Sequence, residues 1–239
     1  MFVLERYRAV DASEILRALQ QLVGDPTWSS AGVYAYWDPG SHEILYLGLA
    51  SSLPARFKAH NGLGGTGASG NKLEEITEYF RSHDELGFSV GVQSSASGES
   101  GRGLAAHSEG QLLEDYRRMY GRFPAWNKVG GSRIGARLSR TDSSNIFELL
   151  SGAIDSLLVA RRPLRRLVED AEALWNEAIL HTARIYSQMF AGLGDQRLSD
   201  ADILRWLESP PALLSEEAPR FERLLDSGYL RLRPLEDPP

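Results

Sequence analysis

The 239-residue sequence contains no cysteine. This absence excludes disulfide bonds, thiolate zinc sites and cysteine nucleophiles, and it fits a protein of the reducing cytoplasm. The chain also lacks an apolar run long enough to span a bilayer, and its first eight residues lack the apolar core of a signal peptide. We therefore expect a cytoplasmic protein that has no membrane partner.

Acidic residues are missing from one stretch, Arg117 to Arg140, although the net charge of the chain is −6. Residues 1–140 carry as many basic as acidic side chains, so residues 141–239 account for the whole negative charge. A local group of cations is typical of a surface that binds a phosphate backbone, and a solvated charged face is the plainer alternative. The candidate nucleic-acid-binding residues are Arg117, Arg118, Arg122, Lys128, Arg133, Arg137 and Arg140.

Two short runs rich in aromatic and aliphatic residues are present near the start of the chain. Residues 32–37 and 43–48 flank the turn sequence Asp38-Pro39-Gly40-Ser41, and this pattern predicts a β-hairpin. Pro54 near the start of the segment 53–60 predicts a helix directly after the hairpin. Arg56 and His60 are four residues apart, so the predicted helix presents both on one face.

This arrangement resembles the GIY-YIG nuclease family. Gly32-Val33-Tyr34 stands at the first tripeptide of that family, and Tyr46-Leu47-Gly48 stands at the second. Arg56 and His60 stand at the arginine and the frequent histidine of the helix that follows. The alternative is a plain hairpin with buried aromatic side chains and a solvated Arg/His pair.

The resemblance also implies one catalytic glutamate on a helix after the third strand. Residues 87–93 alternate like that strand, and residues 104–120 form the next helical pattern. Glu109 shares a helix face with the apolar residues at 112, 113 and 116, whereas Glu114 shares one with basic residues, so Glu109 is favoured and Glu114 remains the alternative. Asn127, after Pro124, matches the asparagine of the family; a turn-forming residue is the other interpretation.

From the resemblance we expect a metal-dependent endonuclease acting on DNA, with RNA not excluded. It implies that Glu109 ligates Mg²⁺ or Mn²⁺, that Tyr34 lies near the attacking water with Tyr46 alongside, and that Arg56 pairs with the phosphate. His60 would orient the water or shuttle a proton, and Asn127 would fix the geometry of Glu109 or of the phosphate. The alternative function is a catalytically silent module that binds nucleic acid or protein. The six expected catalytic residues are Tyr34, Tyr46, Arg56, His60, Glu109 and Asn127.

The predicted fold class is α/β (α+β), with a GIY-YIG-like domain at residues 29–140. Its core is a small, mainly antiparallel sheet of three strands near 32–37, 43–48 and 87–93, flanked by helices. Residues 1–28 are predicted to be a helical extension that begins its helix at Asp11. Residues 141–239 are predicted to be a C-terminal region that is helical over 143–227 and has a short strand at 228–234. We expect that region to serve for homodimerisation or partner binding.

Overall fold

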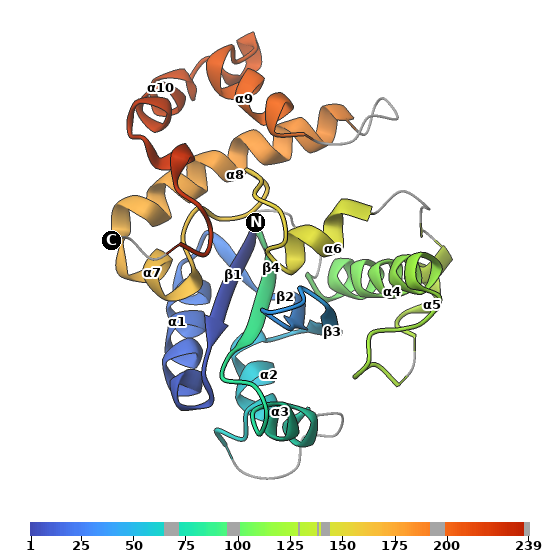
Figure 1. The fold of residues 1–239 in the computed structure, drawn as a ribbon. Helices are drawn as coiled ribbons and strands as arrows, with labels where there is room; N and C mark the ends of the chain where they lie inside the picture. Colours follow the sequence, from blue (N-terminus) through green and yellow to red (C-terminus); the bar gives the residue numbers. More distant parts are fainter. Residues whose placement is uncertain are drawn as a thin grey trace.

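The computed structural model describes residues 1–64, 72–94, 101–128, 130–137, 139, 144–191 and 199–236. It is a mixed α/β fold built on one antiparallel sheet with the strand order β1-β4-β2-β3 (Figure 1). The strands are β1 (Phe2–Tyr7), β2 (Trp28–Trp37), β3 (Ile44–Ala50) and β4 (Leu86–Ser94). The three expected strands are confirmed, but the sheet has four strands and not three.

The strand that the sequence analysis missed is β1, which pairs with β4 from Phe2 opposite Gly91 to Tyr7 opposite Leu86. It lacks a clean alternation because both of its faces are covered: Val3 packs in the larger core, and Leu4 packs with apolar residues of the C-terminal half. Residues 1–28 are therefore part of the sheet and not only a helical extension. A 3-10 turn η1 (Ala9–Asp11) and the helix α1 (Ala12–Gly24) follow β1.

The predicted hairpin is formed by β2 and β3, with Tyr34 opposite Gly48 and Tyr36 opposite Tyr46. Asp38 closes the turn, because its Oδ1 accepts hydrogen bonds from the backbone N–H groups of residues 40 and 41 at 2.7 and 2.9 Å. Such a side-chain-to-backbone turn is what Asp before Pro-Gly-Ser predicts. The register of the hairpin therefore determines which β3 residue lies opposite each β2 residue.

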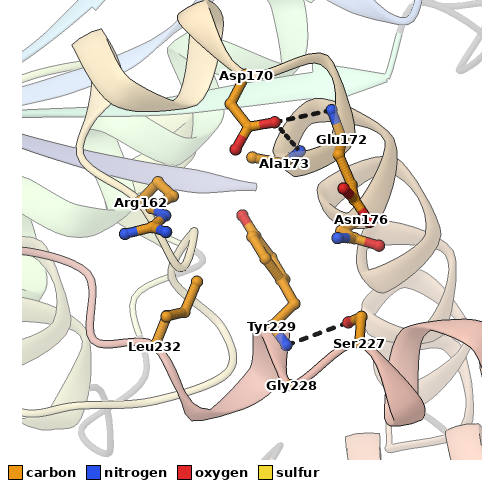
Figure 2. Close-up of a pocket in the computed structure, with 9 residues that line it drawn as sticks. All are labelled: Arg162, Asp170, Glu172, Ala173, Asn176, Ser227, Gly228, Tyr229 and Leu232. Atoms are coloured by element: carbon orange, nitrogen blue, oxygen red, sulfur yellow. Dashed lines mark hydrogen bonds between the residues drawn. The ribbon is translucent and has the colours of Figure 1, made fainter. Parts of the chain in front are cut away.

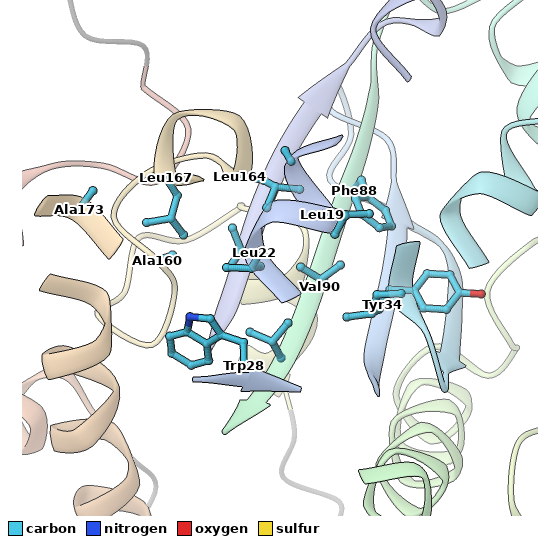
Figure 3. Close-up of a cluster of buried hydrophobic side chains, with 14 of the residues drawn as sticks. Leu19, Leu22, Trp28, Tyr34, Phe88, Val90, Ala160, Leu164, Leu167 and Ala173 are labelled. Atoms are coloured by element: carbon cyan, nitrogen blue, oxygen red, sulfur yellow. The ribbon is translucent and has the colours of Figure 1, made fainter. Parts of the chain in front are cut away.

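Helices cover both faces of the sheet. One face carries Tyr34, Tyr36 and Phe88, and it packs against α1 and α2 (Leu53–His60). Figure 3 shows Tyr34 and Phe88 of this face with Leu19 of α1. The other face carries Trp37 and Leu47, and it packs against α4 (Gly101–Tyr120) and α6 (Ser144–Leu150). Two short helices, α3 (Leu73–Tyr79) and α5 (Arg133–Arg137), follow α2 and α4. Strand β3 is left at the edge of the sheet, between the two layers.

The C-terminal half is helical, as predicted, although it is more broken than the pattern indicated. After α6 come α7 (Leu164–Glu169), α8 (Ala171–Ala191), α9 (Asp200–Glu208), the short η3 (Ala212–Leu214), α10 (Ala218–Asp226) and η4 (Tyr229–Arg231). The strand predicted at 228–234 is wrong. Gly228 adopts φ of 74°, a left-handed conformation that turns the chain into η4 where a strand would need extended backbone.

The C-terminal helices share a core with the sheet. A single apolar cluster joins residues of β1, α1, β2 and β4 to residues of α7, α8, α9 and α10. Backbone contact reinforces it, since the N–H of Ala160 donates to the carbonyl of Phe2 at 2.7 Å. Figure 1 shows α8, α9 and α10 gathered beyond one end of the sheet, beside the N-terminus. Among the residues described above, no helix is long and apolar enough to cross a membrane.

Candidate active site at the edge of the sheet

The outer edge of β3 is closed by groups from α4 and from the loop after it. An edge strand leaves the backbone groups of alternate residues without a neighbouring strand. Here the carbonyl of Leu45 accepts from the N–H of Trp126 at 2.8 Å, and the N–H of Leu49 donates to Oε1 of Glu109 at 3.2 Å. Between them, the side chain of Asn127 holds Leu47. Glu109 of α4 and Asn127 of the following loop are thereby held on the same strand.

Asn127 makes two hydrogen bonds to Leu47, as a neighbouring strand would. Its Oδ1 accepts from the N–H of Leu47 at 2.9 Å, and its Nδ2 donates to the carbonyl of Leu47 at 2.8 Å. The N–H of Asn127 also donates to the carbonyl of Pro124 at 2.9 Å, so the turn interpretation of this residue applies as well. Asn127 therefore fixes the loop to β3, next to the point where Glu109 is attached.

The two tyrosines meet over a glycine. Tyr34 on β2 faces Gly48 on β3, and its ring centre lies 5.7 Å from that of Tyr46. A Cβ at position 48 would stand 2.7 Å from the hydroxyl oxygen of Tyr34 and 2.6 Å from Cε1 of Tyr46. Tyr34 is 3% exposed, whereas Tyr46 is partly exposed. Gly48 thus provides the space in which the two phenols approach each other.

His60 lies at the buried side of this pair. One ring nitrogen, Nε2, is 2.6 Å from the hydroxyl oxygen of Tyr34, and the other, Nδ1, accepts from the backbone N–H of Lys72 at 2.7 Å. Burial, and then the charges of Arg56 and Lys72, lower the pKa of His60 to about 3. His60 is fully buried, so the alternative of a solvated Arg/His pair does not hold for it.

Lys72 is the residue at this site that the sequence analysis missed. It is buried, its ammonium group pairs with Glu75 at 2.9 Å, and its Nζ lies 5.3 Å from the ring centre of Tyr46. Its contact with His60 is made by the backbone, which no side-chain pattern reveals. The available signal was weak: Lys72 is the first cation after the glycine-rich stretch 62–70.

Glu109 and Arg56 complete the group. Burial raises the pKa of Glu109, while the hydrogen bond from Leu49 and the charge of Arg56 oppose this rise. Arg56 lies one helical turn before His60 on α2, and its guanidinium charge acts to lower the pKa of Tyr34, Tyr46 and His60. A narrow hollow brings Glu109 and Tyr34 together beside Gly48.

Glu114, the alternative glutamate, lies on another face of α4. It pairs with Arg117 at 2.7 Å and with Arg118 at 3.0 Å, and these hydrogen bonds lower its pKa to about 2. Leu113 and Tyr116 are buried against the sheet. The helical phase is therefore the one that the sequence indicated, with Glu109 toward β3 and Glu114 away from it.

The carboxylate of Glu109 is compatible with a magnesium ion, although no cluster of ligands surrounds it. The described residues contain no group of three or more His, Asp or Glu side chains that could hold a metal ion. Mg²⁺ keeps several water ligands and often binds through one or two carboxylates together with substrate phosphates. Glu109, partly buried and with one oxygen on the N–H of Leu49, could provide such a single ligand.

The basic stretch is less free of acidic partners than the sequence indicated. Arg117 and Arg118 pair with Glu114, and Arg122 pairs with Glu43 at 2.8 Å, because these acids come from outside the stretch. Arg140 lies outside the described residues. The members that are exposed with no ion pair to another described residue are Lys128, Arg133 and Arg137.

Lys128 precedes, and Arg133 and Arg137 follow, a short segment that packs on α4 beside Glu109. A Cβ at Gly110 would stand 2.3 Å from the carbonyl oxygen of Ser132, and one at Gly131 would stand 3.1 Å from Oε2 of Glu109. Helix α5, which carries Arg133 and Arg137, begins directly after this contact. The fold thus places the start of α5 next to the candidate site.

A second hollow of about 250 Å³ lies in the C-terminal half, between the start of α8 and the end of α10 (Figure 2). Its walls carry charges of both signs, from Arg162 and from Asp170 and Glu172. None of the residues expected to be functional lines it. The expected residues gather instead at the edge of the sheet.

Comparisons of the chain with family models, with curated proteins and with solved structures gave no match. The basis for a function is therefore the geometry at the β3 edge.

Proposed function

We propose that this chain is a metal-dependent endonuclease of the GIY-YIG type that cleaves phosphodiester bonds in DNA. The observation that carries the proposal is the convergence of Tyr34, Tyr46, Arg56, His60 and Glu109 at one edge of the sheet. They come from β2, β3, α2 and α4, and only the folded chain brings them together. A hairpin that merely buried aromatic residues would not need a carboxylate, a guanidinium and two phenols in one place.

The chemistry of phosphodiester cleavage matches these groups. Arg56 is half-buried on α2, one turn before His60, and a guanidinium can bind a phosphate through two parallel hydrogen bonds. Glu109 would hold Mg²⁺ or Mn²⁺, which when bound supplies positive charge for the phosphate and lowers the pKa of a bound water. The phenols provide hydroxyl groups for orienting the water and the phosphate.

The substrate class is supported by the charges around the site. Lys128, Arg133 and Arg137 are exposed along the segment that packs beside Glu109, where a polyanion could follow them. DNA is the proposed substrate. RNA carries the same phosphodiester chemistry, so the assay below should include an RNA of the same sequence.

A cleavage assay tests the proposal. Purified protein is incubated with supercoiled plasmid in Mg²⁺, in Mn²⁺ and in EDTA, and EDTA-treated protein is then returned to Mg²⁺. We expect nicked or linear product with either metal, none in EDTA, and recovery when Mg²⁺ is restored. A protein that binds DNA but leaves it intact in both metals would instead be the catalytically silent module.

A further inference from the structure

The second hollow, in the C-terminal half, combines a fixed aromatic wall with polar groups of α8. Figure 2 shows the ring of Tyr229 between Arg162 on one side and Asn176 on the other. The hydroxyl of Tyr229 donates to Oε1 of the buried Glu177 at 3.0 Å, and this hydrogen bond holds the ring in place. The volume of about 250 Å³ is below the roughly 300 Å³ at which pockets for drug-sized molecules begin, so the hollow suits a smaller ligand.

Asn176 provides the observation that points to a ligand. Its side chain is 3% exposed, and its Oδ1 has no hydrogen-bond partner among the described residues. Buried polar side-chain atoms in folded proteins nearly always have a partner, because the unfolded chain bonds them to water and burial without a replacement is unfavourable. Asn176 lines the second hollow, so a hydrogen-bond donor bound there would be the partner of this oxygen.

Charges of opposite sign line the second hollow without neutralising each other. Arg162 is half-buried and Glu172 is exposed, and neither makes an ion pair with another described residue. Asp170 caps α8, because its Oδ1 accepts from the N–H groups of residues 172 and 173 at 2.9 and 3.1 Å. The start of α8 therefore presents two carboxylates to the hollow, and Arg162 presents one cation.

A zwitterion fits these charges better than an ion of a single sign. A phosphate or a dicarboxylate would pair with Arg162 but would also meet the carboxylates of Asp170 and Glu172. A diamine would pair with the carboxylates but would meet the cation. A free α-amino acid carries one carboxylate and one ammonium group in a small molecule, so it satisfies both signs.

We propose that the second hollow binds a free α-amino acid with a small apolar side chain. Its carboxylate pairs with Arg162, and its ammonium group lies at the acidic start of α8 and donates to Oδ1 of Asn176. Its side chain packs against the ring of Tyr229 and against Leu232. The proposal is independent of the proposed function, since no residue of the β3 edge lines this hollow.

Binding is measured on the purified full chain without DNA or metal. L-alanine, L-valine and L-leucine are each titrated by calorimetry, and the melting temperature is recorded with and without each of them. We expect at least one to bind and to raise the melting temperature, because a ligand that binds only the folded chain stabilises it. If none of the three binds, the hollow holds water only and the proposal is wrong.

Derivatives of the amino acid that binds test the two charged contacts. The amide lacks the carboxylate, and the N-acetyl derivative lacks the ammonium group. Each should bind at least about 10-fold more weakly than the free amino acid, because each loses one charge-assisted hydrogen bond. Equal affinity of either derivative and the free amino acid would overturn the proposal.

Two variants test whether the amino acid binds in the second hollow. Arg162→Gln removes the partner of the carboxylate, and Asn176→Leu replaces the buried amide by an apolar group of similar size. Both should weaken binding at least about 10-fold. Asn176→Leu should melt no lower than the wild type, since it removes a buried oxygen that has no partner in the described chain. A lower melting temperature would instead show that Asn176 has a structural role.

Arg166→Gln is the matched control. Arg166 is an exposed arginine of α7 that does not line the hollow, so this variant should bind the amino acid as the wild type does. Wild-type affinity of Arg162→Gln or of a folded Asn176→Leu would place the amino acid elsewhere and overturn the proposal. Arg162→Gln decides the question alone if Asn176→Leu does not fold.

Discussion

At the scale of single residues, Gly48 is the position at which the backbone and the site depend most closely on each other. The side chain that is missing there leaves the space that the hydroxyl of Tyr34 and the ring of Tyr46 occupy. The register of the β2–β3 hairpin places Tyr34 directly opposite this glycine. The chemistry of the two phenols therefore depends on a residue with no functional group of its own.

We predict that Gly48→Ala disturbs the site. The new methyl group would overlap both tyrosines, and overpacking of this kind costs about 1–3 kcal/mol of folding free energy. The rate of plasmid cleavage should fall by more than the loss of folded protein explains, because the phenols must move apart. Gly24→Ala is the matched control, since a Cβ there meets nothing within 4 Å. Urea unfolding and cleavage of both variants would show the idea to be wrong if they behave alike.

At the scale of elements, a buried ion pair on α8 connects the C-terminal helices to the rest of the chain. Glu177 pairs with Arg184 at 2.7 Å and also accepts from the hydroxyl of Tyr229 at 3.0 Å and from the N–H of Arg161 at 2.8 Å. Arg184 in turn donates to the carbonyl groups of Leu157 and Val159. The segment 157–159 lies beside β1. One carboxylate thus holds α8, η4 and this segment together.

We predict that Glu177→Gln destabilises the protein by about 3–5 kcal/mol, because it leaves the buried charge of Arg184 without a counter-charge. Glu172→Gln, on the exposed surface of the same helix, should change stability by less than about 0.5 kcal/mol. Urea-unfolding midpoints of both variants provide the comparison. A Glu177→Gln protein as stable as the Glu172→Gln control would show that this ion pair does not hold the helices.

The elements that the sequence predicted well are those whose signals are local. The hairpin follows from the turn at Asp38, and α2 follows from Pro54. The structure adds an N-cap that was not predicted, since the Ser52 side chain accepts from the backbone of residue 55. Strand β1 could not be predicted in the same way, because its pairing partner β4 is far along the chain and both of its faces are buried. The shared core of the sheet and the C-terminal helices is likewise a long-range property.

For the candidate site, the periodicity of side chains in the sequence predicted which residues face the sheet, but it did not predict the contacts made by backbone groups. The phase of α4 separated Glu109 from Glu114 correctly in space, because Leu113 and Tyr116 had to face the sheet. The hydrogen bond from the Lys72 backbone to His60 and the ion pair of Arg122 with Glu43 are tertiary contacts. The spacing of residues in the sequence does not predict such contacts.

At the scale of the whole molecule, the distribution of charge matters more than its negative sum. Ion pairs occupy Arg117, Arg118 and Arg122, whereas Arg133 and Arg137 are exposed on α5 beside the candidate site. The two members of α5 are thus better candidates for phosphate contacts than the paired arginines.

We predict that the double variant Arg133→Glu/Arg137→Glu binds DNA more weakly and with a smaller dependence on salt. Each lost phosphate contact should reduce the slope of log K against log salt by about 0.9. The control is Arg205→Glu/Arg220→Glu, which makes the same change in net charge on exposed positions of α9 and α10. Filter binding over a range of NaCl concentrations measures both; equal affinities and slopes would exclude α5 as the DNA-binding surface.

The central claim is that Glu109 is the carboxylate of the site, and its burial gives a first consequence for stability. Because burial raises the pKa of Glu109 above its unfolded-state value, the folded protein holds this proton more tightly than the unfolded chain does. The contribution of Glu109 to stability is therefore largest below the unfolded-state pKa and decreases as pH rises through the folded-state pKa. Without metal at pH 7, Glu109→Gln should be at least as stable as the wild type, since Gln can still accept from the N–H of Leu49.

The most direct test is single-turnover cleavage of DNA at saturating Mg²⁺ by Glu109→Gln and Glu114→Gln, with DNA affinity measured for both. Glu114 is a partly buried partner of Arg117 and Arg118 on the same helix, so Glu114→Gln makes the same chemical change as Glu109→Gln at a different position. We predict that Glu109→Gln binds DNA but cleaves it at least about 1,000-fold more slowly, and that Glu114→Gln cleaves at nearly the wild-type rate. An inactive Glu114→Gln beside an active Glu109→Gln, or two fully active variants, would contradict this account.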